Sequence, residues 1–404
     1  MSGRYHNLTE AQFATLKELY VGLFEYIDHL PSQPSTPSAI SSPTSELSPK
    51  DKPNTEKSPS LGFLGLRKMP KLMGTKETEE PSPASPEVQL NSSEFRSTLF
   101  GVNQFDHPDE LMLRFLRARK WDVKESLKML VKSIQWFHLH DIARLKRVGE
   151  TEVNMSLIKK GECYFQGFDR EGRPVCHINI RLHDPKALTI EEVQSFALLN
   201  METSRLLFVD KVDTVAVLFN LTDFTMANMD YAAVKFLINV LEKDYPESLG
   251  RILILNANWV FSGVWKIISA MLDPVVVEKV KFITLKELTD YIEPSQLPEN
   301  LGGTMKQKMT YLPPSQEENI KMTDSEGRFA AETAFNKTVV TFEEETRKWV
   351  SSASVALSPG RDEAAKDLRA AYAKLDPFIR ARTIYHRLGV IQGPNDVDWS
   401  RMKA

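Results

Sequence analysis

The chain has 404 residues, of which 42% are hydrophobic and 26% charged, and its formal net charge is −3. This length allows one large domain or two ordinary ones, and the slightly acidic balance argues against nucleic acid as a partner. Two cysteines, Cys163 and Cys176, are too few for a disulfide framework, and no apolar stretch reaches the length of a membrane-spanning helix. The N-terminus also lacks the apolar core of a secretory signal, so we expect a soluble intracellular protein.

Residues 1–30 are predicted to contain one amphipathic helix. Thr9 and Gln12 have the spacing of a capping box, and apolar residues follow at helical intervals from Phe13 to Ile27. An isolated helix of this length is only marginally stable in water, so it should pack on another part of the chain.

Residues 31–92 differ in composition, because Pro and Ser dominate and hydrophobic residues are sparse. Such a segment buries too little surface to offset the entropy lost on ordering, and we predict a disordered linker. One stretch, Leu61–Met73, places apolar residues beside Arg67, Lys68 and Lys71. It is either a motif that contacts a membrane or a partner, or an ordinary linker cluster.

Residues 93–145 show helical periodicity again. An apolar stripe from Leu111 to Leu116 predicts one helix, and Asp122 is placed to cap the next. Four cations accompany the first of these helices: Arg114, Arg117, Arg119 and Lys120. They form either a solvated face or, where a helix end adjoins a pocket, a site for an anion.

Residues 150–305 alternate strands with helices, which indicates a sheet with helices packed against it. The predicted strands include 174–180, 215–221, 252–255 and 281–284, and the predicted helices include 189–209 and 231–243. Residues 306–404 are predicted to form a helical C-terminal extension. Its two main helices are expected at 326–350 and 362–388, separated by Pro359-Gly360.

The most apolar helix is predicted between Asn258 and Asp273. At 100° per residue its large apolar side chains fall within one arc of roughly 160°. These side chains are Val260, Phe261, Val264, Trp265, Ile267, Ile268, Met271 and Leu272. The helix is either ordinary core or a movable wall that contacts a hydrophobic cargo and, when it swings out, a bilayer.

Catalytic and cofactor motifs are absent from the sequence, which has no GxSxG elbow, Walker loop, GxGxxG after a strand, HExxH or CxxC. His177 and His183 are a weak pattern for a metal site, and a half-exposed hairpin histidine is the better interpretation. We therefore expect no enzyme activity, no cofactor and no metal.

Four stretches, in this order along the chain, resemble the CRAL-TRIO family in its fungal phosphatidylinositol-transfer branch. They are LMLRFLRARKWDV, FDREGRPV, DYPESLGRILILNANWVFSGVWKIISAMLDPVVVEKV and LPENLGG. The resemblance covers about residues 95–303, half the chain, and implies an α/β fold. In that fold a small helical N-terminal module precedes a mixed β-sheet. The helices that flank the sheet form the floor of an apolar lipid pocket and the gate that closes it. The N-terminal helix, the linker and the C-terminal extension resemble a smaller fungal subgroup more loosely.

The resemblance also implies which residues bind the phosphoinositide headgroup: Arg119, Lys120, Glu247 and Lys279. Cations suit a phosphate diester, and a carboxylate accepts inositol hydroxyls or orients a lysine. Val276 stands where the transfer proteins usually have a threonine, so one headgroup hydrogen bond should be missing. The implied lipid pocket and gate comprise Val215, Val217, Val260, Phe261, Val264, Trp265, Ile268, Met271, Leu272 and Val276.

Phosphatidylcholine is not expected as a ligand. Family members that bind choline lipids place Ser and Thr at the positions that Val215 and Val217 occupy here. Valine cannot bond a phosphate, and these side chains would suit a sterol or a terpenoid instead.

Three functions stay open at this point. The first is binding and transfer of phosphatidylinositol, the second is transport of a sterol-like or terpenoid ligand, and the third is an interaction scaffold with a vestigial pocket. The expected partners are phosphatidylinositol, a second hydrophobic lipid, a transiently contacted membrane surface and a lipid kinase. The expected location is the cytoplasm, with peripheral association to the ER, endosomes or other internal membranes.

Overall fold

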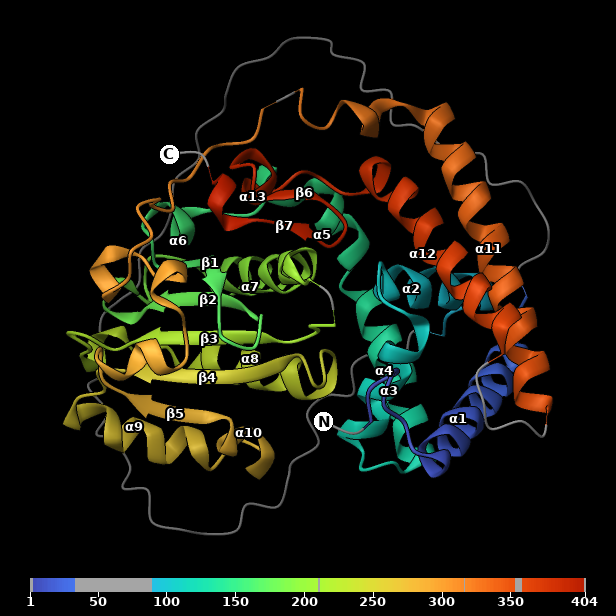
Figure 1. Ribbon diagram of the computed structural model, residues 1–404, viewed down its shortest axis with the longest axis horizontal. Helices are drawn as coiled ribbons and strands as arrows, with labels where there is room; N and C mark the ends of the chain where they lie inside the picture. The colour runs from blue at the N-terminus through green and yellow to red at the C-terminus, as the bar shows by residue number, and fades with distance from the viewer. Residues whose placement is uncertain (1–2, 33–88, 210, 316, 353–357, 403–404) are drawn as a thin grey trace, which may run out of the picture.

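The computed structural model describes residues 3–32, 89–209, 211–315, 317–352 and 358–402. A sheet with its helices lies beside a layer of helices drawn from both ends of the chain (Figure 1). The predicted disordered linker, including Leu61–Met73, falls largely outside the described residues. Within those residues, no helix is both long enough and apolar enough to cross a membrane.

The helical layer contains α1 (Glu10–His29), α2 (Ser92–Asn103), α3 (Pro108–Ala118), α4 (Val123–Leu139), α11 (Ser325–Ser351) and α12 (Pro359–Ile379). Two short helices, α5 (Ile142–Val148) and α6 (Ser156–Lys159), lead from it to the sheet. The strands are β1 (Cys163–Phe168), β2 (Pro174–Asn179), β3 (Val215–Asn220), β4 (Leu249–Leu255) and β5 (Val280–Ile283). The helices around the sheet are α7 (Ile190–Ser204), α8 (Tyr231–Lys243), α9 (Trp259–Ser269) and α10 (Pro274–Glu278).

The sheet has the order β1-β2-β3-β4-β5, with β1 antiparallel to β2 and the remaining neighbours parallel. The mixed sheet that the family resemblance implies is therefore confirmed. Side chains alternate between its two faces. Ala216 and Leu218 lie on one face, in a buried cluster with Leu288 and Ile292 from the segment after β5. The other face carries Val215, Val217 and their neighbours.

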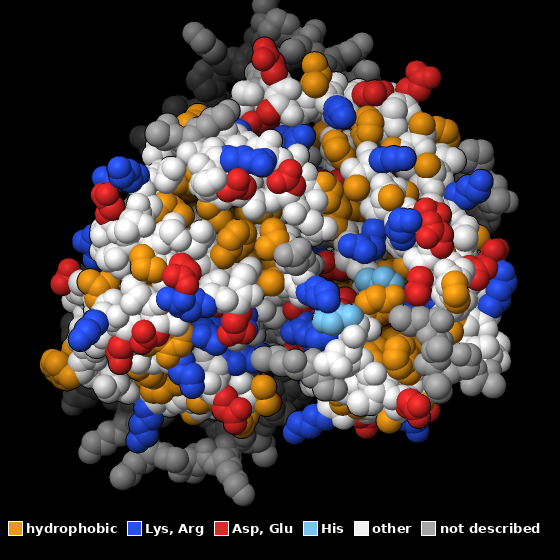
Figure 2. Space-filling model, viewed as in Figure 1, with side chains coloured by type: hydrophobic (Ala, Val, Ile, Leu, Met, Phe, Trp, Pro, Cys, Tyr) orange, Lys and Arg blue, Asp and Glu red, His pale blue; other side chains and the backbone are white. Residues whose placement is uncertain are grey.

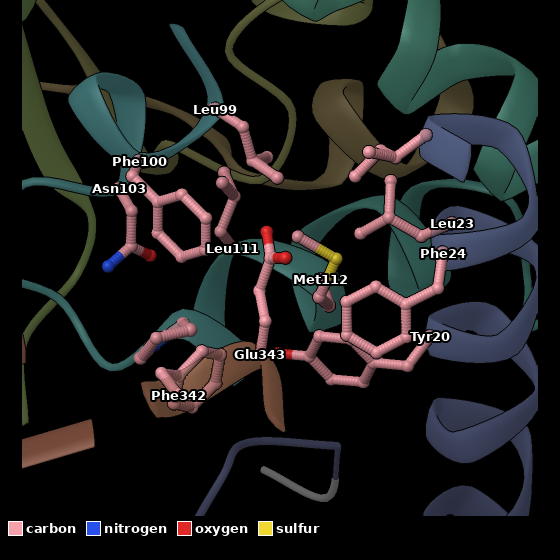
Figure 3. A pocket seen from close by; sticks show the side chains of 12 residues that line it. Tyr20, Leu23, Phe24, Leu99, Phe100, Asn103, Leu111, Met112, Phe342 and Glu343 are labelled. Atoms are coloured by element: carbon pink, nitrogen blue, oxygen red, sulfur yellow. The ribbon is translucent and has the colours of Figure 1, made fainter. Parts of the chain in front are cut away.

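The N-terminal helix packs on the rest of the chain, as its amphipathic pattern requires. Leu16, Leu19, Leu23 and Ile27 of α1 are buried in one cluster with residues of α2, α3, α4, α11 and α12. Side chains of α1, α2, α3 and α11 meet around a void of about 20 Å³, which is far too small for a lipid (Figure 3). This seam is the core of the helical layer.

The linker ends before the predicted boundary at residue 92. Leu90 is buried in the same cluster as Phe95, four residues after the N-cap Asn91. A hydrophobic residue before the N-cap often packs on the fourth helical residue, which fixes how the chain enters the helix. Burial of Leu90 in this cluster places the residues just before α2 within the helical layer.

The C-terminal extension differs from the prediction in two respects. Pro359 begins α12 instead of separating two helices, because proline is well tolerated at the first helical position. The predicted helix 362–388 ends at Ile379, shortly after Pro377, and Arg380 adopts an extended backbone. The remaining chain forms α13 (Ile384–Arg387), β6 (Ile391–Gly393) and β7 (Asp396–Val397), so the extension is not wholly helical.

A fully buried ion pair joins α3 to α12. Arg361 Nη1 donates to Asp109 Oδ2 at 2.8 Å, and Arg361 Nη2 also donates to Asp109 Oδ1. Tyr20 Oη of α1 donates to Asp109 Oδ1 at 2.7 Å, and Arg361 Nε donates to Thr346 Oγ1 of α11 at 3.1 Å. The Arg361 guanidinium also lies 4.4 Å from the ring centroid of Trp349. Four helices therefore meet at one charge pair.

The pKa values of both partners favour their charged forms. Burial alone would lower the pKa of Arg361, but the Asp109 carboxylate outweighs burial and raises it. Burial alone would raise the pKa of Asp109, but Arg361 outweighs it and lowers that pKa.

We predict that Arg361→Met lowers the free energy of unfolding by about 3–5 kcal/mol, because it leaves Asp109 buried without its counter-ion. Urea denaturation measures this change. The matched control is Arg347→Met, which removes an ion pair between Arg347 and Asp28 at the surface and should cost less than about 1 kcal/mol. Equal losses in the two variants would contradict a central role for the buried pair.

Candidate functional site

A cavity of about 790 Å³ lies between the sheet and the helices α7, α8, α9 and α10. This volume is within the range of roughly 300–1,000 Å³ that is typical of ligand pockets. The lining is mainly apolar along its length, with charged and polar residues at both ends. Such a shape suits a long hydrophobic ligand with a polar group.

The sheet contributes one wall of the cavity. Val215, Val217 and Phe219 of β3 line it, and Ile252 and Ile254 of β4 continue the same face. Because side chains alternate along a strand, the two valines fall on the cavity side, opposite Ala216 and Leu218. No hydroxyl is present at these two predicted positions.

The helix α9 and the segment after it contribute the opposite wall. The predicted pocket and gate residues that line the cavity here are Phe261, Trp265, Ile268, Met271, Leu272 and Val276. Val260 and Val264, which were expected there, are not among the lining residues. Val264 is buried with Leu221 and Phe224, and Val260 packs on the same cluster. The apolar arc of α9 therefore includes more side chains than the cavity contacts. Its border with Val260 and Val264 packs instead against residues at the end of the sheet.

The other border of the apolar arc faces outward. Ile267 is 51% exposed, whereas Phe261 is only 8% exposed. Trp259 at the start of α9 is 86% exposed, and Met271, Val275, Phe282 and Leu285 are exposed nearby in the chain. A contiguous helix and edge strand that expose several large apolar side chains are typical of a surface that contacts a membrane or a partner.

The four predicted headgroup residues all line one end of the cavity. Arg119 and Lys120 follow α3, Glu247 lies in the turn between α8 and β4, and Lys279 follows α10. Lys279 Nζ donates to the Leu249 carbonyl at 2.9 Å and lies 3.9 Å from Glu247 Oε2. The carboxylate is therefore placed to orient the lysine, and the arginine and lysine after α3 supply further positive charge.

The backbone at this end has an unusual conformation that no pattern in the sequence predicted. Lys120, Trp121 and Glu247 have φ angles of 51°, 68° and 57°, in the left-handed region that non-glycine residues rarely adopt. Such conformations persist only where surrounding contacts hold them, and they often occur at functional sites.

Arg114 is one of the contacts that hold this end in place. Arg114 Nη1 donates to the Glu247 carbonyl at 3.1 Å, and Arg114 Nη2 lies 3.4 Å from Asp213 Oδ2. Arg4 and Arg117 also pair with Asp213. Burial lowers the pKa of Arg114 and of Arg117 to about 10, so both stay cationic at neutral pH. Figure 2 shows Lys and Arg side chains gathered near the centre of the view, between the sheet and the helical layer.

Sequence reasoning identified Arg114 and Arg117 as part of a cationic helix but not as supports of the Glu247 turn. Their spacing of three residues places them on one helix face, and this was the available signal. Arg4 and Asp213 lie in segments without periodic pattern, and no signal in the sequence indicated their pairing.

Asp244, which also lines this end, has its pKa raised by burial to about 7.

The opposite end of the cavity carries a second polar group of residues that the sequence did not predict as a site. Glu162, His183, Asn228 and Asp230 line the cavity there.

The expectation that His177 is half exposed is wrong, because it is buried and its Nε2 lies 2.9 Å from the Gln166 carbonyl. Burial lowers the pKa of His177 to about 4, so it is neutral at physiological pH.

An elongated apolar cavity under a mixed sheet, with cations at one end and an apolar helix as a wall, defines a lipid-binding protein of the CRAL-TRIO type. Comparison with known families agrees with this assignment. The CRAL/TRIO domain matches residues 158–303, and the CRAL/TRIO N-terminal domain matches residues 71–132. The chain belongs to the CRAL-TRIO family.

Two relatives extend the similarity over much of the chain. Phosphatidylinositol transfer protein CSR1 of Eremothecium gossypii is 30% identical over an alignment of 437 positions, gaps included, which covers 96% of this chain and 98% of that protein. A CRAL-TRIO domain-containing protein of Schizosaccharomyces pombe is 38% identical over 299 residues, covering 71% of this chain and 66% of its own length. The crystal structure of Sfh5 matches with a TM-score of 0.43 and 18% identity, over 52% of this chain and 76% of that one.

We predict that an introduced aspartate affects stability differently on the outward border of α9, at Ile267, and on its inward side, at Phe261. Ile267→Asp should change the thermal unfolding temperature little, because Ile267 is half exposed. It should nevertheless slow lipid exchange between vesicles, because a carboxylate resists entry into an anionic interface. Phe261→Asp, the matched variant on the same helix, should destabilise the fold by several kcal/mol or remain protonated. If Ile267→Asp unfolds the protein as readily as Phe261→Asp, the outward border is ordinary core.

Proposed function

We propose that this protein binds phosphatidylinositol and transfers or presents it between membranes, without exchanging phosphatidylcholine. The observation that carries the proposal is the convergence of Arg119, Lys120, Glu247 and Lys279 at one end of an otherwise apolar cavity. These residues come from three separate segments of the chain. A role in transfer is also supported by the 30% identity to a protein named as a phosphatidylinositol transfer protein over nearly the whole chain.

The cavity lowers the free-energy cost of removing a lipid from a bilayer, which is the main obstacle to lipid transfer. Each CH₂ group removed from a bilayer into water costs roughly 0.8 kcal/mol, so a two-chain lipid is held by tens of kcal/mol. A closed apolar cavity offsets most of this cost, because the chains move from one apolar environment to another. In our proposal α9 is the gate, and its exposed side chains enter the bilayer interface while the lipid moves.

The headgroup end is suited to an anion but not to every phospholipid. Positive charge from Arg119, Lys120 and Lys279 matches a phosphate diester, and Glu247 can accept inositol hydroxyls. Val276 lines the cavity and offers no hydrogen bond, so we expect a weaker headgroup contact than a threonine would give. The phosphate of phosphatidylcholine would meet Val215 and Val217, which have no donor.

This function requires binding and release and no bond-breaking chemistry, so we propose a carrier and not an enzyme. Contact with membranes would be peripheral and transient, on internal membranes such as the ER or endosomes, from a cytoplasmic pool. A lipid kinase that phosphorylates the presented headgroup is a suitable recipient. A neutral sterol-like or terpenoid ligand is the second candidate, because Val215 and Val217 present hydrocarbon to the cavity.

We predict that Arg119→Ala combined with Lys279→Ala abolishes phosphatidylinositol transfer between vesicles while the protein stays folded, because both side chains are polar groups at the edge of a cavity. Transfer is measured with labelled donor vesicles, and folding by circular dichroism. Arg147→Ala combined with Lys374→Ala removes the same charges from exposed positions away from the cavity, and it should transfer lipid normally. Unchanged transfer by the Arg119/Lys279 variant would refute the headgroup assignment.

We also predict that Val215→Ser combined with Val217→Thr introduces measurable phosphatidylcholine binding, because two hydroxyls would then face the cavity. Lipid exchange with labelled phosphatidylcholine measures the gain. The control is Ala216→Ser, which places a hydroxyl on the opposite face of β3 and should add no binding. If the wild-type protein already exchanges phosphatidylcholine, the argument from missing hydroxyls fails.

A further inference from the structure

The cavity has a second polar end that the headgroup residues do not explain. The cationic end lies where β3 and β4 begin, and Glu162, His183 and Asp230 lie where the parallel strands finish. Glu162 precedes β1, whose first residue pairs with Ile178 near the end of β2, and Asp230 is the N-cap of α8. β4 has seven residues, so the two ends are roughly 20 Å apart at about 3.3 Å per residue.

Glu162 at this end is buried with an unused acceptor. Its side chain is 5% exposed, and Oε1 lies 2.6 Å from His183 Nδ1. The other oxygen, Oε2, has no hydrogen-bond partner among the described residues. A buried acceptor without a partner is costly, and native proteins usually satisfy it. This oxygen belongs to a residue that lines the cavity, so a ligand is a natural source of the missing donor.

The surrounding groups fix what kind of ligand atom can bind here. The hydrogen bond to Glu162 raises the pKa of His183, and His183 Nδ1 donates to Glu162 Oε1. His183 Nε2 lies 3.5 Å from Asp230 Oδ2, and Asp230 Oδ1 accepts from the Ala233 amide. The acceptors that remain are carboxylate oxygens, and a ligand must therefore bring a hydrogen-bond donor. No set of three or more side chains that could hold a metal ion converges in the described part of the chain.

We propose that Glu162 and His183 form a second binding subsite, which holds the hydroxyl group of a neutral hydrophobic ligand such as a sterol or a terpenoid alcohol. The proposal rests on the cavity being a lipid site, as proposed above, but not on phosphatidylinositol being its ligand. The hydroxyl donates to the Glu162 carboxylate, and the hydrocarbon body lies along Ile178, Val217 and Phe219.

A hydroxyl fits this subsite better than an ammonium group. Glu162 Oε1 is already paired with His183 Nδ1, and Asp230 Oδ2 lies 3.5 Å from His183 Nε2, so neither carboxylate is free to pair with a buried ammonium alone. Asp230 is more exposed than Glu162 and uses one oxygen to cap α8. A neutral hydroxyl satisfies the unused acceptor without adding a charge to the apolar cavity.

The test compares a sterol with its own ether. Dehydroergosterol carries a free hydroxyl and is excited by energy transfer from tryptophan, and Trp265 lines the cavity. We expect the purified full-length protein to bind dehydroergosterol at least tenfold more tightly than its 3-O-methyl ether, because the ether cannot donate. Glu162→Met should weaken binding of the sterol to the level of the ether and leave the ether unchanged. The matched control Glu191→Met, at an exposed position on α7, should behave as the wild type.

Equal affinity of the wild type for the sterol and the ether would overturn the proposal, and this comparison needs no variant to fold. Loss of both ligands in a folded Glu162→Met protein would indicate a structural role only and would also overturn it. If a long-chain amine binds more tightly than the sterol and loses affinity in Glu162→Met, the ligand group bound at this subsite is an ammonium. That result would overturn the assignment of a hydroxyl. A wild type that shows this preference but does not transfer phosphatidylinositol would contradict only the earlier proposal.

Discussion

The buried pair between Asp109 and Arg361 is the contact on which the placement of the cationic cavity end depends. Asp109 lies in the first turn of α3, and Arg119 caps the other end of the same helix. An α-helix of this length is rigid, so fixing its first turn against α1, α11 and α12 also fixes the direction in which its last turn points. Helices from both the N-terminal and the C-terminal parts of the chain thereby position two of the residues that line the cavity.

A second buried network ties the helical layer to the turn that carries Glu247. Glu202 of α7 accepts hydrogen bonds from Gln104 at 2.6 Å and from Tyr245 at 2.9 Å, and Lys146 of α5 lies 3.9 Å away. Tyr245 is two residues before Glu247, whose backbone also accepts from Arg114. Support from both sides explains how a left-handed backbone at Glu247 is maintained. A large cavity lacks the packing of a filled core, and these polar networks hold its walls from outside.

The sequence predicts the sheet and the wall helices well, because their patterns are local. The apolar runs at 215–221 and 252–255 correspond to β3 and β4, and the arc of α9 separates Phe261 from Ile267 correctly. Periodicity could not exclude Val260 and Val264 from the cavity, because it shows which side of a helix is apolar but not what covers it. The end of α12, the burial of His177 and the pairing of Arg4 with Asp213 depend on contacts between distant segments. The Glu162–His183 subsite was missed for the same reason.

The most direct test of the central claim is to identify the lipids that leave the cavity. The full-length protein would be purified from a eukaryotic host, gel-filtered to remove loosely bound lipid, extracted with organic solvent and examined by mass spectrometry. Phosphatidylinositol should be recovered in an amount comparable to the protein, with phosphatidylcholine at background level. Recovery of phosphatidylcholine in similar amounts, or of no phosphatidylinositol above that of a heat-denatured control, would contradict the account.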